Sequence, residues 1–196
     1  GANSLDEYIF FSPDQNTSRV LYYYNPDANE SFGQINISPF DSLFLHPKIN
    51  EPSSKFGQSV AINDWNQTIF GSPGEAGFVD GAVHIFNQES NGSYSYNEKI
   101  VPPIPEQLGQ FGHSLTLANE FLFIGSPDVS TYSGSVDVFR RESNGSYHFQ
   151  ESLNNNSKMF DSFGWDISVS GNILAVSSIQ AISNGSGKIS IFEKSG

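Results

Sequence analysis

Three short segments of the chain repeat one pattern, Phe-Gly-x-Ser or Phe-Gly-x-Asp followed by alternating apolar residues. They read FGQSVAI at 56–62, FGHSLTL at 111–117 and FGWDISV at 163–169, at spacings of 55 and 52 residues. The hexapeptide ESNGSY also occurs twice without change, at 89–94 and 142–147. Repetition at such a period indicates that one supersecondary unit is copied along the chain, so the fold must be an array of that unit.

Each unit has the composition of four short strands. The Phe-Gly segment is followed by a polar turn and an apolar run, TIFGSP, FLFIGSP or ILAVSS, and then by an alternating run, GAVHIF, GSVDVF or GKISIF. A more polar run, SYSYNEKI or SYHFQESL, completes the two middle units. No stretch of useful length has a helical period. Four strands in roughly 50 residues are typical of a propeller blade, so we predict an all-β chain with the fold of a β-propeller.

The pattern predicts one domain over residues 1–196, built of four blades or partial blades. In the first unit DEYIFFSP at 6–13 matches the second strand, RVLYYYN the third and ESFGQINISP the fourth, whereas the last unit stops before a fourth strand. Three arrangements remain open: a closed ring of four blades, two chains that complete a larger ring by self-association through the incomplete blades, and a fragment of a larger ring. The units lie at approximately 1–55, 56–110, 111–162 and 163–196.

Turn residues punctuate these units. Pro13, Pro73 and Pro127 should end the second strands, because proline cannot donate a hydrogen bond to a neighbouring strand. Gly71 and Gly125 mark places where another backbone bends or comes close. The repeated Ser-Asn-Gly-Ser is an Asn-Gly turn between the third and fourth strands. One face of each third strand should be apolar at alternate positions: Val83 and Ile85, Val136 and Val138, and Ile189 and Ile191.

Three elements follow one another in each of the two middle units: Phe-Gly-x-Ser, then Gly-Ser-Pro, then Gly-Ala-Val or Gly-Ser-Val. This order resembles the FG-GAP repeat of integrin α-subunit propellers and of related surface and secreted proteins. The resemblance covers 56–196 clearly and 1–55 weakly. It implies a β-propeller in an extracellular adhesion or interaction setting.

Many repeats of the family carry a calcium loop between the first and second strands. Here the same connections read NDWNQ, ANE and SGN, which are short and poor in the carboxylates that calcium requires. The chain therefore resembles the calcium-free variety. Asp64 is interpreted as a turn residue, and no metal or cofactor is expected.

Charge and composition restrict the partners. The net charge of −12 repels phosphate backbones and anionic lipid, so nucleic acid and membrane surfaces are disfavoured. The chain has no run of 18 apolar residues, so direct membrane insertion is not expected, and it has no cysteine for a thiolate site or a thiol nucleophile.

Asn-x-Ser/Thr sequons are more frequent than the roughly three expected for this composition. Their excess predicts a glycoprotein that is secreted or displayed at a cell or particle surface. The alternative is that loops rich in Ser and Asn produce sequons incidentally. The candidate sites are Asn16, Asn29, Asn36, Asn66, Asn91, Asn144, Asn155 and Asn184.

Catalytic patterns are scarce. The chain has no Gly-x-Ser-x-Gly elbow at a strand-to-helix turn and no phosphate-binding glycine loop before a helix. Its four histidines fall at four different places in the repeat, which disfavours a shared metal site. They are His46, His84, His113 and His148. We expect a non-enzymatic protein.

The residue after each Phe-Gly pair varies within an otherwise repeated frame: it is Gln58, His113 or Trp165. The FG-GAP resemblance places this slot on the innermost strand, near the propeller axis. These side chains are expected either to pack there or to line a ligand or water site.

Loops between the second and third strands, together with loops between blades, open on one face of FG-GAP propellers. The loops between the second and third strands correspond to residues 14–18, 74–80, 128–133 and 179–186. Phe78 and Tyr132 lie beside the acids Asp80 and Asp128, a composition that fits an aromatic anchor with a polar rim. The alternative is an ordinary set of turns with incidental aromatic residues.

Tyr22, Tyr23 and Tyr24 form an aromatic run that the sequence aligns with His84, Ile85 and Phe86 of the next third strand. The rings are interpreted as alternating between core and blade surface, and the alternative is a stacking platform for sugar.

These observations predict a recognition or adhesion module that binds protein or glycan through propeller loops. The alternative function is an architectural repeat segment of a larger surface assembly.

Overall fold

The computed structural model describes residues 20–25, 30–36, 45, 53–75, 81–104, 109–154, 159–179 and 186–194. The chain divides into two compact units, Gly1–His46 and Pro47–Gly196, which are described separately. In the described parts, every regular element except one helix of four residues is a β-strand. The prediction of an all-β chain is confirmed.

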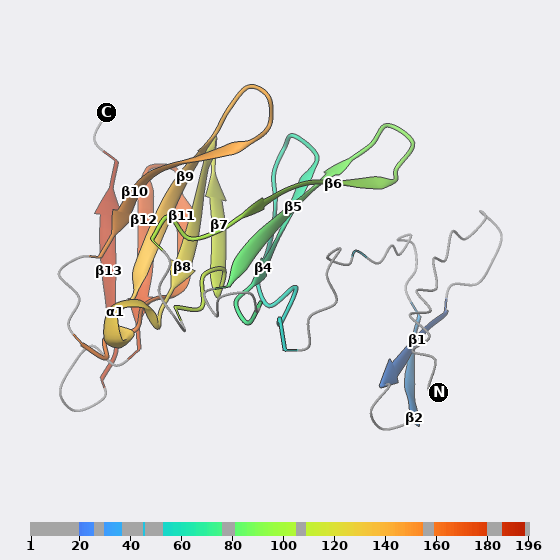
Figure 1. The fold of residues 1–196 in the computed structure, drawn as a ribbon, viewed down its shortest axis with the longest axis horizontal. Coiled ribbons are helices and arrows are strands. Elements are labelled where there is room, and N and C mark those ends of the chain that lie inside the picture. Colours follow the sequence, from blue (N-terminus) through green and yellow to red (C-terminus); the bar gives the residue numbers. More distant parts are fainter. Residues whose placement is uncertain are drawn as a thin grey trace. The chain divides into compact units, whose positions relative to one another are not determined.

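The larger unit holds three antiparallel sheets in which strand order follows chain order (Figure 1). The first sheet contains β3 (Val60–Ile62), β4 (Gln67–Ser72), β5 (Ala82–Gln88) and β6 (Tyr94–Ile100). The second contains β7 (Ser114–Ala118), β8 (Phe121–Ser126), β9 (Ser135–Arg141) and β10 (Tyr147–Leu153). The third contains β11 (Phe163–Ser170), β12 (Ile173–Ser178) and β13 (Lys188–Glu193). Helix α1 (Val129–Tyr132) follows β8.

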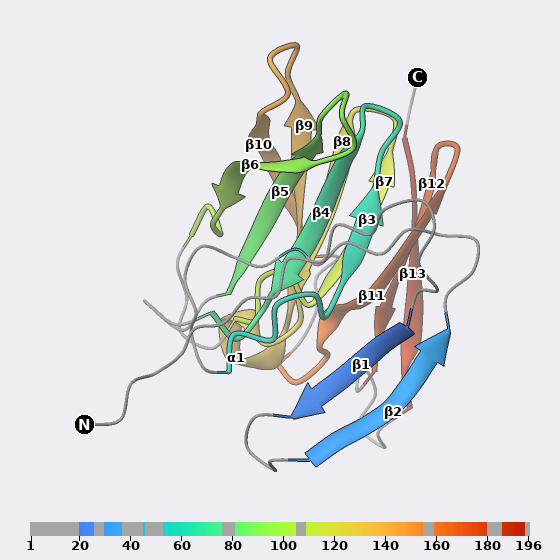
Figure 2. The same ribbon diagram turned by 90° about the vertical axis from the view of Figure 1, so that its right-hand side faces the viewer.

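The sheets stand side by side in chain order, and Figure 2 looks onto the first of them. Their first strands are neighbours, because β3 contacts β7, and β7 contacts β11. Parallel bridges join Gly81 to Phe111 and Gly134 to Phe163. The chain just before each third strand is thus attached to the Phe-Gly pair of the next sheet.

Glycines permit this close approach. A Cβ on Gly71 would lie 1.9 Å from the carbonyl oxygen of Gly112, and one on Gly125 would lie 2.2 Å from that of Gly164. Gly112 and Gly164 both have a φ of +89°, a conformation that side chains other than glycine rarely adopt. The prediction of close backbone approach at Gly71 and Gly125 is confirmed.

The serine of the Phe-Gly-x-Ser pattern links successive sheets. Ser59 Oγ donates a hydrogen bond to the carbonyl oxygen of Gly112 at 2.7 Å, and Ser114 Oγ donates to that of Gly164 at 2.8 Å. The repeated Phe-Gly-x-Ser sequence therefore forms the same hydrogen bond between successive sheets twice. We call this contact, a serine hydroxyl bonded to the glycine carbonyl of the next Phe-Gly pair, the joint.

Two apolar cores fill the spaces between the sheets. The first lies between the first and second sheets: Ile69, Val83, Ile85, Ile100, Phe111, Leu122, Ile124, Phe139 and Tyr147. The second lies between the second and third sheets: Val136, Phe163, Ile167, Leu174 and Val176. The prediction of an apolar face is confirmed for β5 and β9. On β13 the corresponding Ile189 and Ile191 are each 63% exposed, because no described sheet follows the third one.

Turn positions also agree with the sequence. Pro73 and Pro127 directly follow β4 and β8, and Asp64 lies in the turn between β3 and β4. Pro13 and the strand expected at 6–13 lie outside the described residues.

Both copies of ESNGSY form the same hairpin turn. Gly92 and Gly145 have φ values of +81° and +89°. In the first copy, Asn91 Oδ1 accepts a hydrogen bond from the backbone nitrogen of Ser93. In the second copy, Asn144 Oδ1 accepts the equivalent bond from the backbone nitrogen of Ser146. The prediction that the hexapeptide recurs as a hairpin turn is confirmed.

Only the second copy is docked on another sheet in the described structure. Gln67 Nε2 donates to the carbonyl oxygen of Gly145 at 2.9 Å, and the backbone nitrogen of Tyr147 donates to Glu98 Oε1 at 2.9 Å. The Tyr147 hydroxyl accepts a hydrogen bond from Asn63 Nδ2 at 3.1 Å. The second hexapeptide is therefore part of the interface between the first and second sheets.

The described residues of the smaller unit form an antiparallel hairpin of β1 (Val20–Asn25) and β2 (Glu30–Asn36). Its register shifts by one residue between Tyr22 and Tyr23, just as the register of β5 with β6 shifts between Ile85 and Phe86. The hairpin therefore repeats the third and fourth strands of a sheet.

This register corrects the alignment of the tyrosine run. Tyr22 takes the place of Ile85, so its alignment with His84 is wrong by one residue.

Candidate functional site

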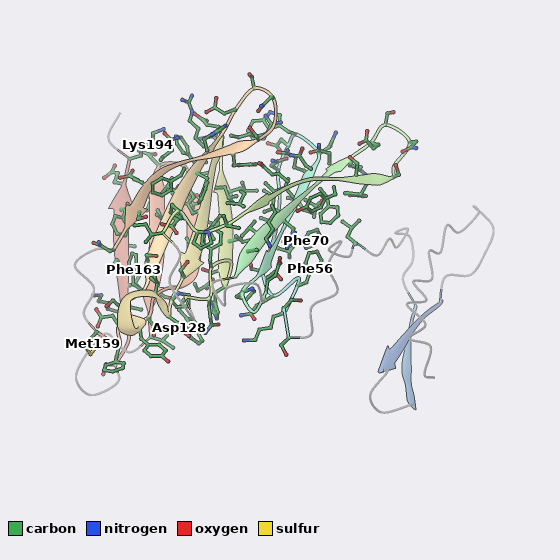
Figure 3. All side chains as sticks on the ribbon, viewed as in Figure 1. Phe56, Phe70, Asp128, Met159, Phe163 and Lys194 are labelled. Atoms are coloured by element: carbon green, nitrogen blue, oxygen red, sulfur yellow. The ribbon has the colours of Figure 1, made fainter. Side chains whose placement is uncertain are left out.

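Loops from the second and third sheets meet at one end of the strands. Helix α1 follows β8 at this end, and the segment 159–162 enters β11 there. Figure 3 places Asp128 and Met159 at the same end. We call this region the loop end.

A pair of exposed aromatic rings lies at the loop end. The rings of Tyr132 and Phe160 are stacked, with centroids 5.9 Å apart and planes inclined by 19°. They are 42% and 52% exposed, and the neighbouring Met159 is 59% exposed. The backbone nitrogen of Ser162 donates to the carbonyl oxygen of Tyr132 at 2.7 Å, which ties the two loops together.

The backbone beneath both rings is unusual. Tyr132 has a φ of +64° and Phe160 a φ of +70°. Bulky residues rarely adopt left-handed conformations, and such strain often occurs at functional sites. The sheets therefore hold the two rings at an energetic cost.

Asp128, the acid that the sequence places beside Tyr132, lies just before α1, and the backbone nitrogen of Tyr132 donates to its carbonyl oxygen at 3.2 Å. Gln110 Nε2 donates a hydrogen bond to Asp128 Oδ2, and the backbone nitrogen of Asp128 donates to the carbonyl oxygen of Gly109 at 3.4 Å. The other predicted pair, Phe78 and Asp80, lies outside the described residues.

Sequence reasoning missed Phe160 and Met159 as members of this region. Their only signal is the Met-Phe pair that precedes the third Phe-Gly segment, in a loop between sheets. The residues are distant in sequence from Tyr132, and the stacking depends on how two sheets are placed.

Two of the three variable residues after Phe-Gly meet. The rings of His113 and Trp165 have centroids 4.6 Å apart, and His113 Nδ1 donates to the backbone oxygen of Trp165 at 3.1 Å. Burial lowers the pKa of His113, while the bond to the Trp165 carbonyl acts in the opposite direction. Gln58 is exposed in the turn before β3. The contact favours the packing interpretation for His113 and Trp165.

A buried polar network lies in the first sheet. His84 Nε2 is 2.5 Å from Glu75 Oε2, and Lys99 Nζ donates to Glu75 Oε1. The hydroxyl of Tyr96 is 3.4 Å from His84 Nδ1, and the ring of Phe56 lies edge-on against the imidazole, with centroids 5.5 Å apart. The imidazole therefore lies between the Glu75 carboxylate and the Tyr96 hydroxyl.

The electrostatics of this network favour an ionised carboxylate. Burial alone would raise the pKa of Glu75, but the hydrogen bonds and positive charges of Lys99 and His84 outweigh it, so the pKa lies below its ordinary value. Burial and the charge of Glu75 raise the pKa of Tyr96. Glu75 and His84 are only 6% and 3% exposed. The network therefore braces the segment after β4 against β5 and β6.

The second sheet has a smaller buried polar pair at the same place. Asp137 on β9 pairs with Ser152 on β10. These two residues occupy the positions that His84 and Lys99 occupy on β5 and β6 of the first sheet. Ser152 Oγ donates to Asp137 Oδ1, and burial raises the pKa of Asp137 although this hydrogen bond acts to lower it. The repeat keeps a buried polar residue at this position with different chemistry.

Of the predicted glycosylation sites, Asn66, Asn91 and Asn144 are exposed, and Asn36 lies on β2. Four others lie outside the described residues: Asn16, Asn29, Asn155 and Asn184.

Within the described ranges, no three His, Asp or Glu residues lie close enough together to hold a metal ion. No helix in that part of the chain has the length and hydropathy needed to cross a membrane.

Comparison with models of known protein families gives no match, and no curated protein matches the sequence. The likeness to the FG-GAP repeat therefore depends on the repeated residues themselves.

Proposed function

We propose that the chain is a non-catalytic recognition or adhesion module, secreted or displayed at a surface, that binds protein or glycan through its loop end. The carrying observation is the stacked and exposed pair of Tyr132 and Phe160, with Met159 beside it. Exposed aromatic side chains and methionine are enriched at binding interfaces, where they bury large apolar areas. Loops carried by rigid sheets are common places for such sites.

We propose further that the sheets are blades of an FG-GAP-like β-propeller without calcium loops. The support is threefold: each sheet is a meander in chain order, the Phe-Gly-x-Ser serines make the same bond between sheets twice, and the N-terminal hairpin has the register of a third and fourth strand.

Binding arrays test the recognition proposal. The biotinylated chain, tetramerised on labelled streptavidin, is applied to a printed glycan array and to an array of extracellular protein domains. We expect saturable binding on one of them, reduced at least tenfold by the double change Tyr132→Ala and Phe160→Ala.

Phe149→Ala is the matched control. Phe149 is 43% exposed, and its ring packs edge-on against Phe139 with centroids 5.7 Å apart, so it resembles Tyr132 in exposure and also contacts one ring, but it lies on β10. The control should retain binding within twofold. Absence of saturable binding on both arrays, or an equal loss for both variants, would refute a loop-end recognition site, and thermal melts verify that the variants are folded.

The architectural alternative is favoured by a different observation. The third sheet exposes Ile173 on β12 and Ile189 and Ile191 on β13, and β3 exposes Val60 and Ile62. Apolar patches of this kind mark association surfaces. Light scattering over a range of concentrations distinguishes the two functions, since an architectural segment should self-associate and a recognition module should remain monomeric.

A further inference from the structure

The third sheet departs from the first two at the place where they form the joint. The joint needs a serine on the first strand of a sheet and a glycine opposite it on the second strand: Ser59 with Gly71, and Ser114 with Gly125. In the third sheet β11 pairs with β12 in the corresponding register, and the two positions hold Asp166 and Ser177. Both members of the pair are therefore replaced.

Glycine at the second position makes room for the backbone of the next sheet. A Cβ on Gly125 would lie 2.1 Å from Ser114 Oγ and 2.2 Å from the carbonyl oxygen of Gly164. Carbon atoms normally stay about 3.5 Å or more from such neighbours, so the joint leaves no space for a side chain. Ser177 places a Cβ at this position. A carbonyl oxygen of a further sheet therefore cannot reach the third sheet as Gly164 reaches the second.

Asp166 also lacks the donor that the joint requires. Ser59 and Ser114 donate to a carbonyl oxygen, whereas a carboxylate only accepts hydrogen bonds and repels a carbonyl oxygen. The backbone nitrogen of Asp166 donates instead to Ser177 Oγ at 2.9 Å, and Asp166 Oδ1 accepts from the backbone nitrogen of Ile167 at 3.0 Å. The Ser177 hydroxyl thus bonds within its own sheet.

The chain before the third strand differs as well. Gly81 and Gly134 have φ values of +83° and +82°, and each is bridged to the Phe-Gly segment of the next sheet. The same position before β13 is Gly187, whose φ lies outside the left-handed range. A Cβ on Gly187 would meet first the carbonyl oxygen of Ser178, in its own sheet, at 3.0 Å. A third feature that receives a Phe-Gly pair is therefore missing.

We propose that the face of the third sheet turned away from the second excludes the Phe-Gly pair of a further sheet of this repeat. Val176 belongs to the second core, and successive side chains of a strand point to opposite faces, so Ser177 lies on the excluding face. The exclusion follows from residues within the third sheet and applies whatever segment lies beyond it. A partner of this surface must use a contact other than the joint. This inference goes beyond the proposed function and does not depend on the loop-end site.

A longer chain tests the exclusion. Residues 142–196 are repeated directly after Lys194, which bonds to the turn of its sheet as Arg141 does, so that a fourth strand and another Phe-Gly pair follow the third sheet. Ile173→Val and Ile189→Val in the added copy distinguish its peptides by mass. Hydrogen exchange in the added 163–193 segment should be at least tenfold faster than in the original third sheet.

Restoring the joint supplies the comparison. In the longer chain, Asp166→Ser with Ser177→Gly in the original third sheet should slow exchange in the added sheet at least tenfold. Gly187 does not oppose this change, because glycine readily adopts a positive φ. Equal exchange in the added sheet with and without the two changes would overturn the proposal.

The reciprocal change uses the original chain. Ser114→Asp with Gly125→Ser moves the third-sheet residues into the second sheet and should accelerate exchange in β11, β12 and β13 at least tenfold. The matched control, Asp166→Ser with Ser177→Gly, makes the same exchanges in reverse and should leave the first two sheets within twofold. A folded Ser114→Asp, Gly125→Ser variant whose third sheet exchanges normally would also overturn the proposal. The longer chain retains the test if that variant fails to fold.

Discussion

Single glycines control how closely the sheets approach. Gly57 and Gly112 both follow phenylalanine, and their φ values are +83° and +89°. They differ in surroundings, because a Cβ on Gly57 meets no atom within 4 Å, whereas a Cβ on Gly112 would lie 2.7 Å from a backbone oxygen of the preceding sheet. Substituting Gly57 therefore tests backbone strain alone, whereas substituting Gly112 tests backbone strain together with the close approach of the preceding sheet.

We predict that Gly57→Ala lowers the free energy of unfolding by about 1–2 kcal/mol, the cost of a left-handed alanine. Gly112→Ala should lose at least about 2 kcal/mol more, because backbone atoms must move. Urea unfolding of both variants measures the difference. Similar losses would show that the close approach at Gly112 is not needed.

Asp137 makes stability depend on pH. Burial raises the pKa of Asp137, so the folded chain retains this proton to a higher pH than the unfolded chain does. The contribution of Asp137 to stability is full below the unfolded pKa of about 4 and is lost as the pH rises through the folded pKa.

Asp137→Asn should therefore be more stable than the original chain at neutral pH, and this advantage should shrink as the pH falls through the folded pKa of Asp137 towards about 4. The amide oxygen can still accept the hydrogen bond from Ser152. Thermal melts from pH 3 to pH 8 measure the effect. The exposed Asp64→Asn is the control, and an equal change in its pH profile would contradict the role of burial.

At the scale of elements, identical sequences take different roles because of their neighbours. Tyr94 and Tyr147 end the two copies of the same hexapeptide. Tyr147 is 6% exposed in the first core, whereas Tyr94 is half-buried and packs against no other described sheet.

Tyr147→Ala should cost about 3–5 kcal/mol, the usual range for removing a buried aromatic ring. Tyr94→Ala should cost about 1 kcal/mol or less, as expected of a surface position. Chemical denaturation of the two variants provides the comparison. A loss for Tyr94→Ala as large as that for Tyr147→Ala would mean that the first copy is docked as well.

Local patterns predicted the elements well and their contacts poorly. Alternating apolar residues and the Asn-Gly turns predicted the strands and hairpins, because these depend on nearby residues. The buried contact of Glu75 with His84 and Lys99 was not predicted, since a loop, a third strand and a fourth strand supply its members. The stacking of Tyr132 on Phe160 was missed for the same reason.

At the scale of the larger unit, the second sheet is shared by both cores. In such a chain of neighbours, stability is approximately a sum of contributions from adjacent pairs. Val83 and Val176 are each fully buried, the first in the core before the second sheet and the second in the core after it.

Val83→Ala and Val176→Ala should each cost about 2 kcal/mol. Hydrogen exchange should locate the loss differently: Val83→Ala should accelerate exchange in β4 and β5, and Val176→Ala in β11, β12 and β13. Identical, chain-wide acceleration in both variants would instead indicate that the three sheets open as one cooperative unit.

The bond from Ser59 to Gly112, repeated from Ser114 to Gly164, has an evolutionary consequence. Each joint needs only a serine in one copy and a Phe-Gly pair in the next, so an inserted or deleted gene segment of one whole period leaves every remaining joint chemically complete. Unequal recombination can therefore lengthen or shorten such a gene by whole periods without requiring a new contact between sheets. An insertion or deletion of a few residues inside a period would instead change the distance in sequence between the serine and the next Phe-Gly pair. Related chains should therefore differ in length mainly by whole periods.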